Sequence, residues 1–144
     1  KINEYLKIGV NDGAELYQSS CSLPKKGFFV KPTLFLNASQ SHRISQEEIF
    51  GPVVTIMPFD TTEEVIGYAN STKYGLAATV WTQHLTRAHQ VAAQLHSGIV
   101  WINCWLLRDL RTPFGGVKQS GVGREGGWNA MNFFTEPKNV CVKL

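Results

Sequence analysis

Residues 53–102 read VVTIMPFDTTEEVIGYANSTKYGLAATVWTQHLTRAHQVAAQLHSGIVWI, and this stretch decides the fold. Apolar runs of strand length at 53–59, 76–82 and 99–102 alternate with two segments whose apolar residues recur at helical spacing. The almost continuous apolar character of these strands is typical of a parallel sheet covered on both faces. We therefore expect an α/β fold, with a layered parallel sheet and helices packed on it.

Both helices between these strands carry sequence signals for their ends. Thr61 and Glu64 form a capping box, so the first helix is expected to begin there and to run to about Asn70. The second helix carries its apolar stripe over 85–95, and Gly98 is expected to stop it. These signals fix the alternation of strand and helix along the chain.

The flanks of this stretch are predicted from shorter patterns. Pro32 argues for an edge or a bend in the strand that contains it, and Ser45 with Glu48 forms a second capping box that predicts a short helical turn. The further expected elements are a helix over 2–13, a loop over 18–27, a strand over 28–36, a glycine-rich loop over 113–123, a helix over 124–133 and a strand over 140–144.

The composition indicates an ordinary globular protein and excludes several classes. The 144 residues suffice for one compact domain, and 43% hydrophobic against 17% charged residues argues against disorder. A net charge of +3 with scattered Lys and Arg provides no basic stripe, so we expect no nucleic-acid partner. No apolar run approaches the length of a membrane span and no signal peptide is visible, so we expect no membrane association.

Three cysteines, Cys21, Cys104 and Cys141, fit neither a disulfide framework nor a paired zinc motif. We interpret them as reduced, mostly buried thiols of a cytoplasmic protein. Cys104 follows an apolar strand, as a nucleophile could, but the sequence places no base or anion-stabilising group beside it. A small buried hydrophobe is the better interpretation. The four histidines do not pair at metal-ligand spacing, so no metal site is expected.

The segment Glu47–Pro52, EEIFGP, combines two carboxylates, an aromatic residue and a Gly-Pro turn just before a buried strand. The carboxylate of Glu48 could accept two hydrogen bonds from a vicinal diol such as that of a ribose. The ring of Phe50 could pack against a flat heterocycle. The structural alternative is a helix-capping Glu beside a core Phe.

Two further segments suggest binding. Trp105–Thr112, WLLRDLRT, follows a buried strand, where ligands bind in open α/β sheets, and Arg108 or Arg111 could grip a carboxylate through two hydrogen bonds. The alternative is an Arg–Asp surface pair. The glycine-rich loop Pro113–Gly123 requires unusual backbone conformations, but it lacks the strand and the acidic residue of a dinucleotide fingerprint, so we reject it as a phosphate site.

Taken together, EEIFGPV at 47–53, ANSTKYGLAA at 69–78, PFGG with Lys118, and SGVGRE at 120–125 resemble the aldehyde dehydrogenase superfamily in order and spacing. The resemblance covers the whole chain and corresponds to about the last third of a family member. The chain starts at Lys1 within a helical pattern, and we expect it to be a piece of a longer protein. The resemblance implies a partial catalytic domain over 1–134, an oligomerisation strand over 135–144, and a Rossmann domain that is mostly absent.

The resemblance implies an oxidoreductase that converts an aldehyde into a carboxylic acid with NAD, NADP not being excluded. In the family a cysteine thiolate attacks the aldehyde, a glutamate activates water, and an asparagine with a backbone N–H holds the oxyanion. These residues match positions upstream of Lys1, so we expect no catalytic residue in this chain and no activity of the chain alone.

The resemblance assigns roles to several residues that are present. Glu48 matches the glutamate that accepts hydrogen bonds from the nicotinamide ribose, and Phe50 the aromatic residue near the nicotinamide. Phe114 matches an aromatic residue that lines the aldehyde tunnel. Arg124 and Glu136 match structural positions near the subunit interface, and the tail over 139–144 matches a strand that joins a neighbouring subunit's sheet, so a homo-oligomer is expected.

Within the superfamily, WLLRDLRT joined to PFGG, with the ending NVCVKL, is similar to 2-hydroxymuconate and 2-aminomuconate semialdehyde dehydrogenases. This similarity implies a small aldehyde substrate that bears a carboxylate. Arg108 matches the arginine that clamps it, as a buried cation that would reject neutral aldehydes. Betaine-aldehyde and broad-range dehydrogenases remain alternatives, as does a non-catalytic module that joins full-length subunits through its terminal strand.

Overall fold

The computed structural model describes all 144 residues, and the chain divides into two compact units, Lys1–Tyr68 and Ala69–Leu144. Each unit has its own small sheets, and each contains one parallel strand pair. The α/β class with parallel strand pairs is therefore confirmed. No helix has the length and apolar character that a bilayer crossing requires.

The first unit is a three-stranded sheet covered by helix α1. Strand β1 (Glu15–Gln18) pairs antiparallel with β2 (Thr33–Leu36), and β2 pairs parallel with β3 (Val53–Thr55). Helix α1 (Ile2–Asn11) and the short α2 (Arg43–Gln46) complete the unit. Its core consists of small and large apolar side chains, Ala14, Phe35, Ala38, Ile44 and Ile49.

Phe35 is the centre of this core, with no exposed surface. A Cβ atom on Gly9 of α1 would lie only 2.5 Å from two atoms of the Phe35 ring, so the helix packs directly against it. Val53 and Leu16 of the sheet and Ile2 and Tyr5 of α1 pack around the same cluster. The position of α1 over the sheet is thereby fixed by apolar contact.

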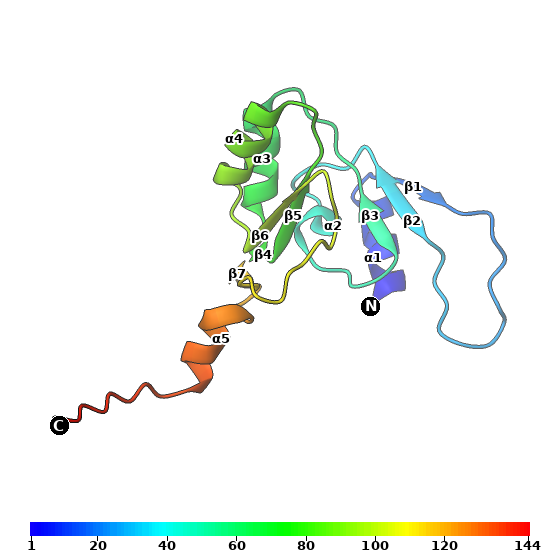
Figure 1. Ribbon diagram of the computed structural model, residues 1–144. Helices are drawn as coiled ribbons and strands as arrows, with labels where there is room; N and C mark the ends of the chain where they lie inside the picture. Colours follow the sequence, from blue (N-terminus) through cyan, green and yellow to red (C-terminus); the bar gives the residue numbers. More distant parts are fainter. The chain divides into compact units, whose positions relative to one another are not determined.

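The second unit is built on a strand–helix–strand crossover. Strands β5 (Ala77–Val80) and β6 (Ile99–Ile102) pair in parallel, and α4 (Leu85–Gln94) connects them. Figure 1 shows α4 lying along these two strands, and Ala88 and Val91 are its buried residues. The stripe predicted from the sequence is thus buried at its middle, whereas its first residue, Leu85, is 72% exposed.

Helix α3 (Thr62–Ser71) spans the boundary between the two units and begins as its capping residues predicted. The Thr61 hydroxyl accepts a hydrogen bond from the Glu64 N–H at 3.1 Å. The Glu64 carboxylate accepts from the Asp60 N–H at 2.7 Å, one residue before the position that the capping box uses.

A second, antiparallel pair in this unit was not predicted. It joins β4 (Tyr74–Gly75) to β7 (Val117–Lys118) and so ties the glycine-rich loop to the end of α3. Gly98 lies against this loop, because a Cβ atom added there would fall 1.6 Å from the Gly115 carbonyl oxygen. Glycine is needed at that position for close approach of two backbones.

Several predicted boundaries were wrong. The strand over 28–36 begins only at Thr33, and the strand over 53–59 ends at Thr55, close to Pro58, which has no N–H to donate. The capping box of Ser45 and Glu48 does not form: α2 begins at Arg43, and Glu48 lies beyond its end.

The C-terminal part also differs from expectation. Helix α5 (Gly127–Phe134) begins three residues later than predicted, because Gly126, the residue just before it, has a φ of 85°, outside the right-handed helical region. The segment over 140–144 forms no strand within the chain, and residues 135–144 are exposed. A strand there needs a pairing partner that the chain itself does not supply.

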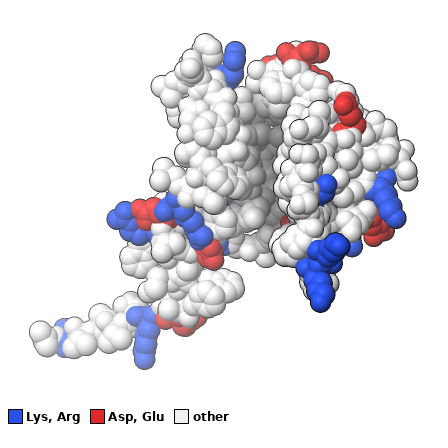
Figure 2. Space-filling model, turned by 90° about the vertical axis from the view of Figure 1, so that its right-hand side faces the viewer, with Lys and Arg blue, Asp and Glu red and all other residues white.

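Charges lie mostly in small groups on the surface. On the face drawn in Figure 2, Lys and Arg lie near Asp and Glu in several places, and wide uncharged areas separate these groups. Many large apolar side chains, among them Trp128 and Phe134, are exposed in the chain. Such exposure is typical of surface that contacts other protein.

Candidate functional site

The turn after α2 holds two neighbouring carboxylates in different environments. Glu47 accepts a hydrogen bond from the Tyr5 hydroxyl at 2.6 Å and two from Arg43, at 3.1 and 2.9 Å. The hydrogen bond to Glu47 is the main reason why the pKa of Tyr5 lies above its usual range, and the same carboxylate raises the pKa of Arg43. The Glu47 carboxylate is therefore engaged by partners within the chain.

Glu48, in contrast, is exposed and makes no hydrogen bond or ion pair within the chain. Its carboxylate is free to accept hydrogen bonds from a ligand. The capping alternative for this residue is wrong, since Glu48 lies past the C-terminus of α2.

Phe50 is exposed and does not belong to the core. The residue is 82% exposed, and its φ of 57° lies in a region that bulky residues avoid. The alternative of a core Phe is therefore wrong, and the core residue of the segment is its neighbour Ile49. Phe50 and Ile49 line one side of a shallow hollow whose other walls are the start of α1 and the segment 27–30.

The second cluster of interest follows the carboxyl end of β6. The buried Trp101 donates its indole N–H to the Leu107 carbonyl at 2.7 Å and meets the Trp105 ring edge to face, with 5.2 Å between centroids. Asn103 binds both backbone groups of Thr82 through its side-chain amide, at 2.8 Å each. These contacts fold the loop back onto the end of the sheet.

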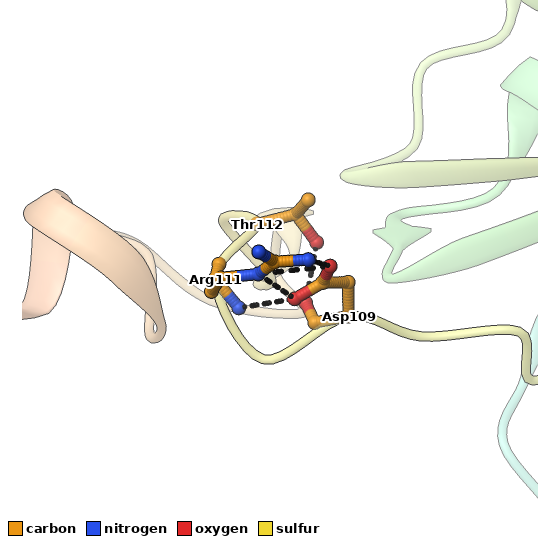
Figure 3. Close-up of polar contacts among 3 residues, drawn as sticks. All are labelled: Asp109, Arg111 and Thr112. Carbon is orange, nitrogen blue, oxygen red and sulfur yellow. Dashed lines mark hydrogen bonds and ion pairs between the residues drawn. The ribbon is translucent and has the colours of Figure 1, made fainter.

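Asp109 and Arg111 form a closed pair within this loop. Figure 3 shows the Arg111 guanidinium against the Asp109 carboxylate, with a shortest contact of 2.5 Å, and the Thr112 hydroxyl donating to the Asp109 carbonyl at 2.7 Å. The pairing lowers the pKa of Asp109 and raises that of Arg111. The surface-pair interpretation thus holds for Arg111, whose charge is already compensated.

Arg108 lies in a different setting. Its guanidinium stacks over the Phe114 ring, 4.3 Å from the centroid, and forms an ion pair with Glu125. Phe114 and Glu125 are themselves joined by two backbone hydrogen bonds, of 2.9 and 2.8 Å. The two residues expected to contact substrate, Arg108 and Phe114, therefore lie in contact.

The expectation of a buried Arg108 is wrong for this chain, because its side chain is 33% exposed and Glu125 balances its charge. Glu125 could not be predicted as this partner, since it is 17 residues away and approaches only because its backbone pairs with Phe114. Cation–π stacking and the ion pair leave other guanidinium N–H groups available.

The glycine-rich loop serves a structural purpose. Arg124 donates to the carbonyls of Gly116 and Gly123, at 2.9 and 2.7 Å, and Lys118 donates to the carbonyls of Asn70 and Thr72, at 2.8 and 2.9 Å. These cations are thereby committed to backbone oxygens.

The thiols do not form a catalytic arrangement. Cys21 and Cys141 are exposed and Cys104 is half-buried, so the expectation of mostly buried cysteines is wrong. None of the three thiols takes part in a hydrogen bond. No group of three or more His, Cys, Asp or Glu side chains is placed to hold a metal ion.

Comparison with known proteins identifies the family of the chain. The family model described as "Aldehyde dehydrogenase family" matches residues 1–140. The chain belongs to the aldehyde dehydrogenase family. This aldehyde dehydrogenase chain is 47% identical to a 2-aminomuconic semialdehyde dehydrogenase of Danio rerio, over 99% of its length. It is 49% identical to a 2-hydroxymuconic semialdehyde dehydrogenase of Pseudomonas sp. (strain CF600), over 100% of its length.

Solved structures show the same fold. The chain superposes with a TM-score of 0.90 on an indole-3-acetaldehyde dehydrogenase from P. syringae, bound to NAD+ and IAA, at 44% identity. The TM-score is 0.87 for an aldehyde dehydrogenase of Bacillus cereus in complex with NAD+, at 49% identity. The alignments cover 99% and 94% of this chain and 29% and 28% of those chains. The chain spans 31% of the length of each of the two curated relatives.

Proposed function

We propose that this chain is the C-terminal portion of an NAD-dependent aldehyde dehydrogenase that oxidises a small carboxylate-bearing semialdehyde to the acid. NADP is kept as an alternative cofactor. The substrates are of the 2-hydroxymuconate or 2-aminomuconate semialdehyde type, as the names of the relatives suggest. The observation that most directly supports this substrate class is the stacking of the Arg108 guanidinium on Phe114, in the segment that follows β6.

The residues of the turn after α2 fit the cofactor. The free carboxylate of Glu48 can accept hydrogen bonds from the two hydroxyls of a ribose, and the exposed Phe50 ring can cover a flat heterocycle. When bound, the dinucleotide supplies the acceptor for the hydride that leaves the aldehyde carbon. Glu48 and Phe50 bind and orient it.

Arg108 and Phe114 are the proposed substrate contacts. A guanidinium held flat against a ring presents its remaining N–H groups in one plane, as a carboxylate requires. Because Glu125 already balances the charge, a neutral aldehyde leaves no uncompensated cation behind. Discrimination therefore comes from the hydrogen bonds that an anionic substrate gains at Arg108, and no rejection of neutral aldehydes by an unpaired charge is expected.

The chemical step itself is assigned to residues outside these 144. We propose that the nucleophilic cysteine, the general-base glutamate and the oxyanion-binding asparagine of the family lie outside these residues, since the three thiols here lack an activating partner. We accordingly propose that the 144 residues alone do not oxidise aldehydes. Three unpaired thiols are compatible with a reducing compartment, which supports a cytoplasmic location.

We propose the domain organisation that the sequence predicts. Residues 1–134 contribute to the catalytic domain, and residues 135–144 add a strand to the sheet of a neighbouring subunit. The exposed tail carries Val140, Val142 and Leu144 at alternating positions, as a strand with one apolar face requires. We therefore propose a homo-oligomer, a dimer or a tetramer.

The test is a comparison of aldehydes with the complete enzyme, following NADH formation. We expect kcat/KM to be highest for a semialdehyde that bears a carboxylate, lower for a neutral aldehyde of equal length, and lowest for one that bears a trimethylammonium group. A preference for the cationic aldehyde would instead support the betaine-aldehyde alternative. Equal rates for all three would support a broad-range enzyme.

A further inference from the structure

Helix α1 holds the turn that carries Glu48 and Phe50 at two points. Ile2 and Tyr5 are three residues apart on α1 and therefore share a face of the helix. The Tyr5 hydroxyl binds Glu47, just before the turn, at 2.6 Å. Ile2 packs on Gly51, just after it: a Cβ atom at Gly51 would lie 2.6 Å from the Ile2 Cδ1. The turn is fixed from both ends.

Glu47 joins three structural elements through these contacts. Arg43 of α2 binds both of its carboxylate oxygens, and Arg43 also stacks over the Tyr5 ring, 5.7 Å from the centroid. The three side chains thus form a closed set of contacts, which we call the Tyr5–Arg43–Glu47 clamp. Because Glu47 is held inward, its neighbour Glu48 remains exposed and without a partner in the chain.

The backbone of Phe50 shows why such a clamp is needed. A φ of 57° is unfavourable for an aromatic residue and persists only where the surroundings impose it. The buried Ile49 and the anchored Glu47 and Gly51 are the surroundings that do so here. If Glu47 were released, Phe50 could relax to an ordinary conformation and its ring would leave the hollow that it lines.

We propose that Glu47 is a positioning residue, which, through the Tyr5–Arg43–Glu47 clamp, holds Glu48 and Phe50 in the conformation that binds the nicotinamide end of the cofactor. This inference rests on the proposed function. It assigns to the first glutamate of the EEIFGP segment a role distinct from that of the second: Glu48 touches the cofactor, whereas Glu47 never does.

The experiment measures the Kd of NAD by calorimetry for the complete enzyme, four single variants and one double variant, with thermal unfolding recorded for each. Tyr5→Phe and Glu47→Gln weaken the clamp while keeping side-chain volume, and Glu48→Gln tests the cofactor contact itself. Tyr68→Phe is the matched control, because it removes another Tyr–Glu hydrogen bond, that between Tyr68 and Glu64 on α3.

We expect Kd for NAD to rise about fivefold to tenfold in Tyr5→Phe and in Glu47→Gln, because only part of the free energy of the lost hydrogen bond is transmitted to the cofactor contact. Tyr68→Phe is expected to bind NAD as the unchanged enzyme does. If the clamp only stabilised the fold, Tyr5→Phe would lower stability without affecting the contact of Glu48 with NAD. A double variant distinguishes the two roles: in the Glu48→Gln background, Tyr5→Phe should have little further effect on the Kd of NAD.

Two results would overturn the inference while leaving the proposed function intact. The first is an unchanged NAD affinity in Tyr5→Phe and Glu47→Gln while Glu48→Gln weakens binding. The second is a loss of binding free energy in the double variant that equals the sum of the losses in its two single variants. Normal NAD binding by Glu48→Gln is a different result. It would overturn the cofactor site, and the positioning role with it.

Discussion

Replacing Arg108 by Ala tests the proposed substrate class. The guanidinium stacks on Phe114 at 4.3 Å and binds Glu125 with one nitrogen, which leaves further N–H groups for a substrate carboxylate. A hydrogen bond to a charged group contributes about 1.5–3 kcal/mol. Because the side chain is 33% exposed, we take the lower half of this range, which corresponds to a loss of about 10-fold to 40-fold in kcat/KM.

The assay follows NADH formation with the complete enzyme, for a carboxylate-bearing semialdehyde and a neutral aldehyde of equal length. The loss in Arg108→Ala is expected for the carboxylate-bearing substrate, mainly as a higher KM, with less than about a threefold change for the neutral one. Arg111→Ala is the matched control, since Arg111 is already paired with Asp109. Glu125→Gln removes the competing carboxylate and should lower KM for the anionic substrate.

Equal losses for both aldehydes in Arg108→Ala would rule out this role, because Arg108 would then support the site without recognising the anion. A large and selective loss in Arg111→Ala would move the carboxylate contact to Arg111. Neither result would alter the family assignment, which rests on residues 1–140.

Two further predictions concern stability. Gly98→Ala places a Cβ atom 1.6 Å from the Gly115 carbonyl oxygen and should lower the unfolding free energy by about 3 kcal/mol or more in denaturant titration. Gly67→Ala is the control, because Gly67 has open space around it in α3 and the change should be neutral or stabilising. Equal effects of the two substitutions would contradict the close approach at Gly98. The hydrogen bond from Tyr68 lowers the pKa of Glu64, so its stabilisation is present above the pKa of an unfolded glutamate and is lost as pH falls through the lower folded pKa. The stability difference between the protein and Tyr68→Phe should therefore shrink in acid, and a difference that is constant with pH would contradict this.

The elements that were predicted well are those with local signals. The stripe of α4 and the capping residues Thr61 and Glu64 act over three or four positions, and both helices form where these signals place them. In β6 the continuous apolar run corresponds to a strand in parallel pairing. The runs that were shortened, at 28–36 and 53–59, lack a partner strand or contain Pro58, so hydrophobicity alone overestimated them.

The parts of the candidate site that could not be predicted depend on contacts far apart in sequence. Glu47 and Glu48 are equivalent by type, and the contacts of Glu47 with Arg43 and with the Tyr5 hydroxyl, 42 residues away, show which one is free. In the same way, Glu125 reaches Arg108 because a backbone pairing with Phe114 brings it there. Residue types indicate where binding is to be expected, whereas the partner of each charged side chain is determined by the fold.

We propose that these 144 residues supply binding groups and no nucleophile. A decisive measurement is the turnover number of the complete enzyme in which Cys21, Cys104 and Cys141 are all replaced by Ser. We expect a kcat within about twofold of the unchanged enzyme at saturating NAD and semialdehyde, since none of these thiols attacks the substrate. A correctly folded triple variant that has lost turnover by about a thousandfold or more would contradict it.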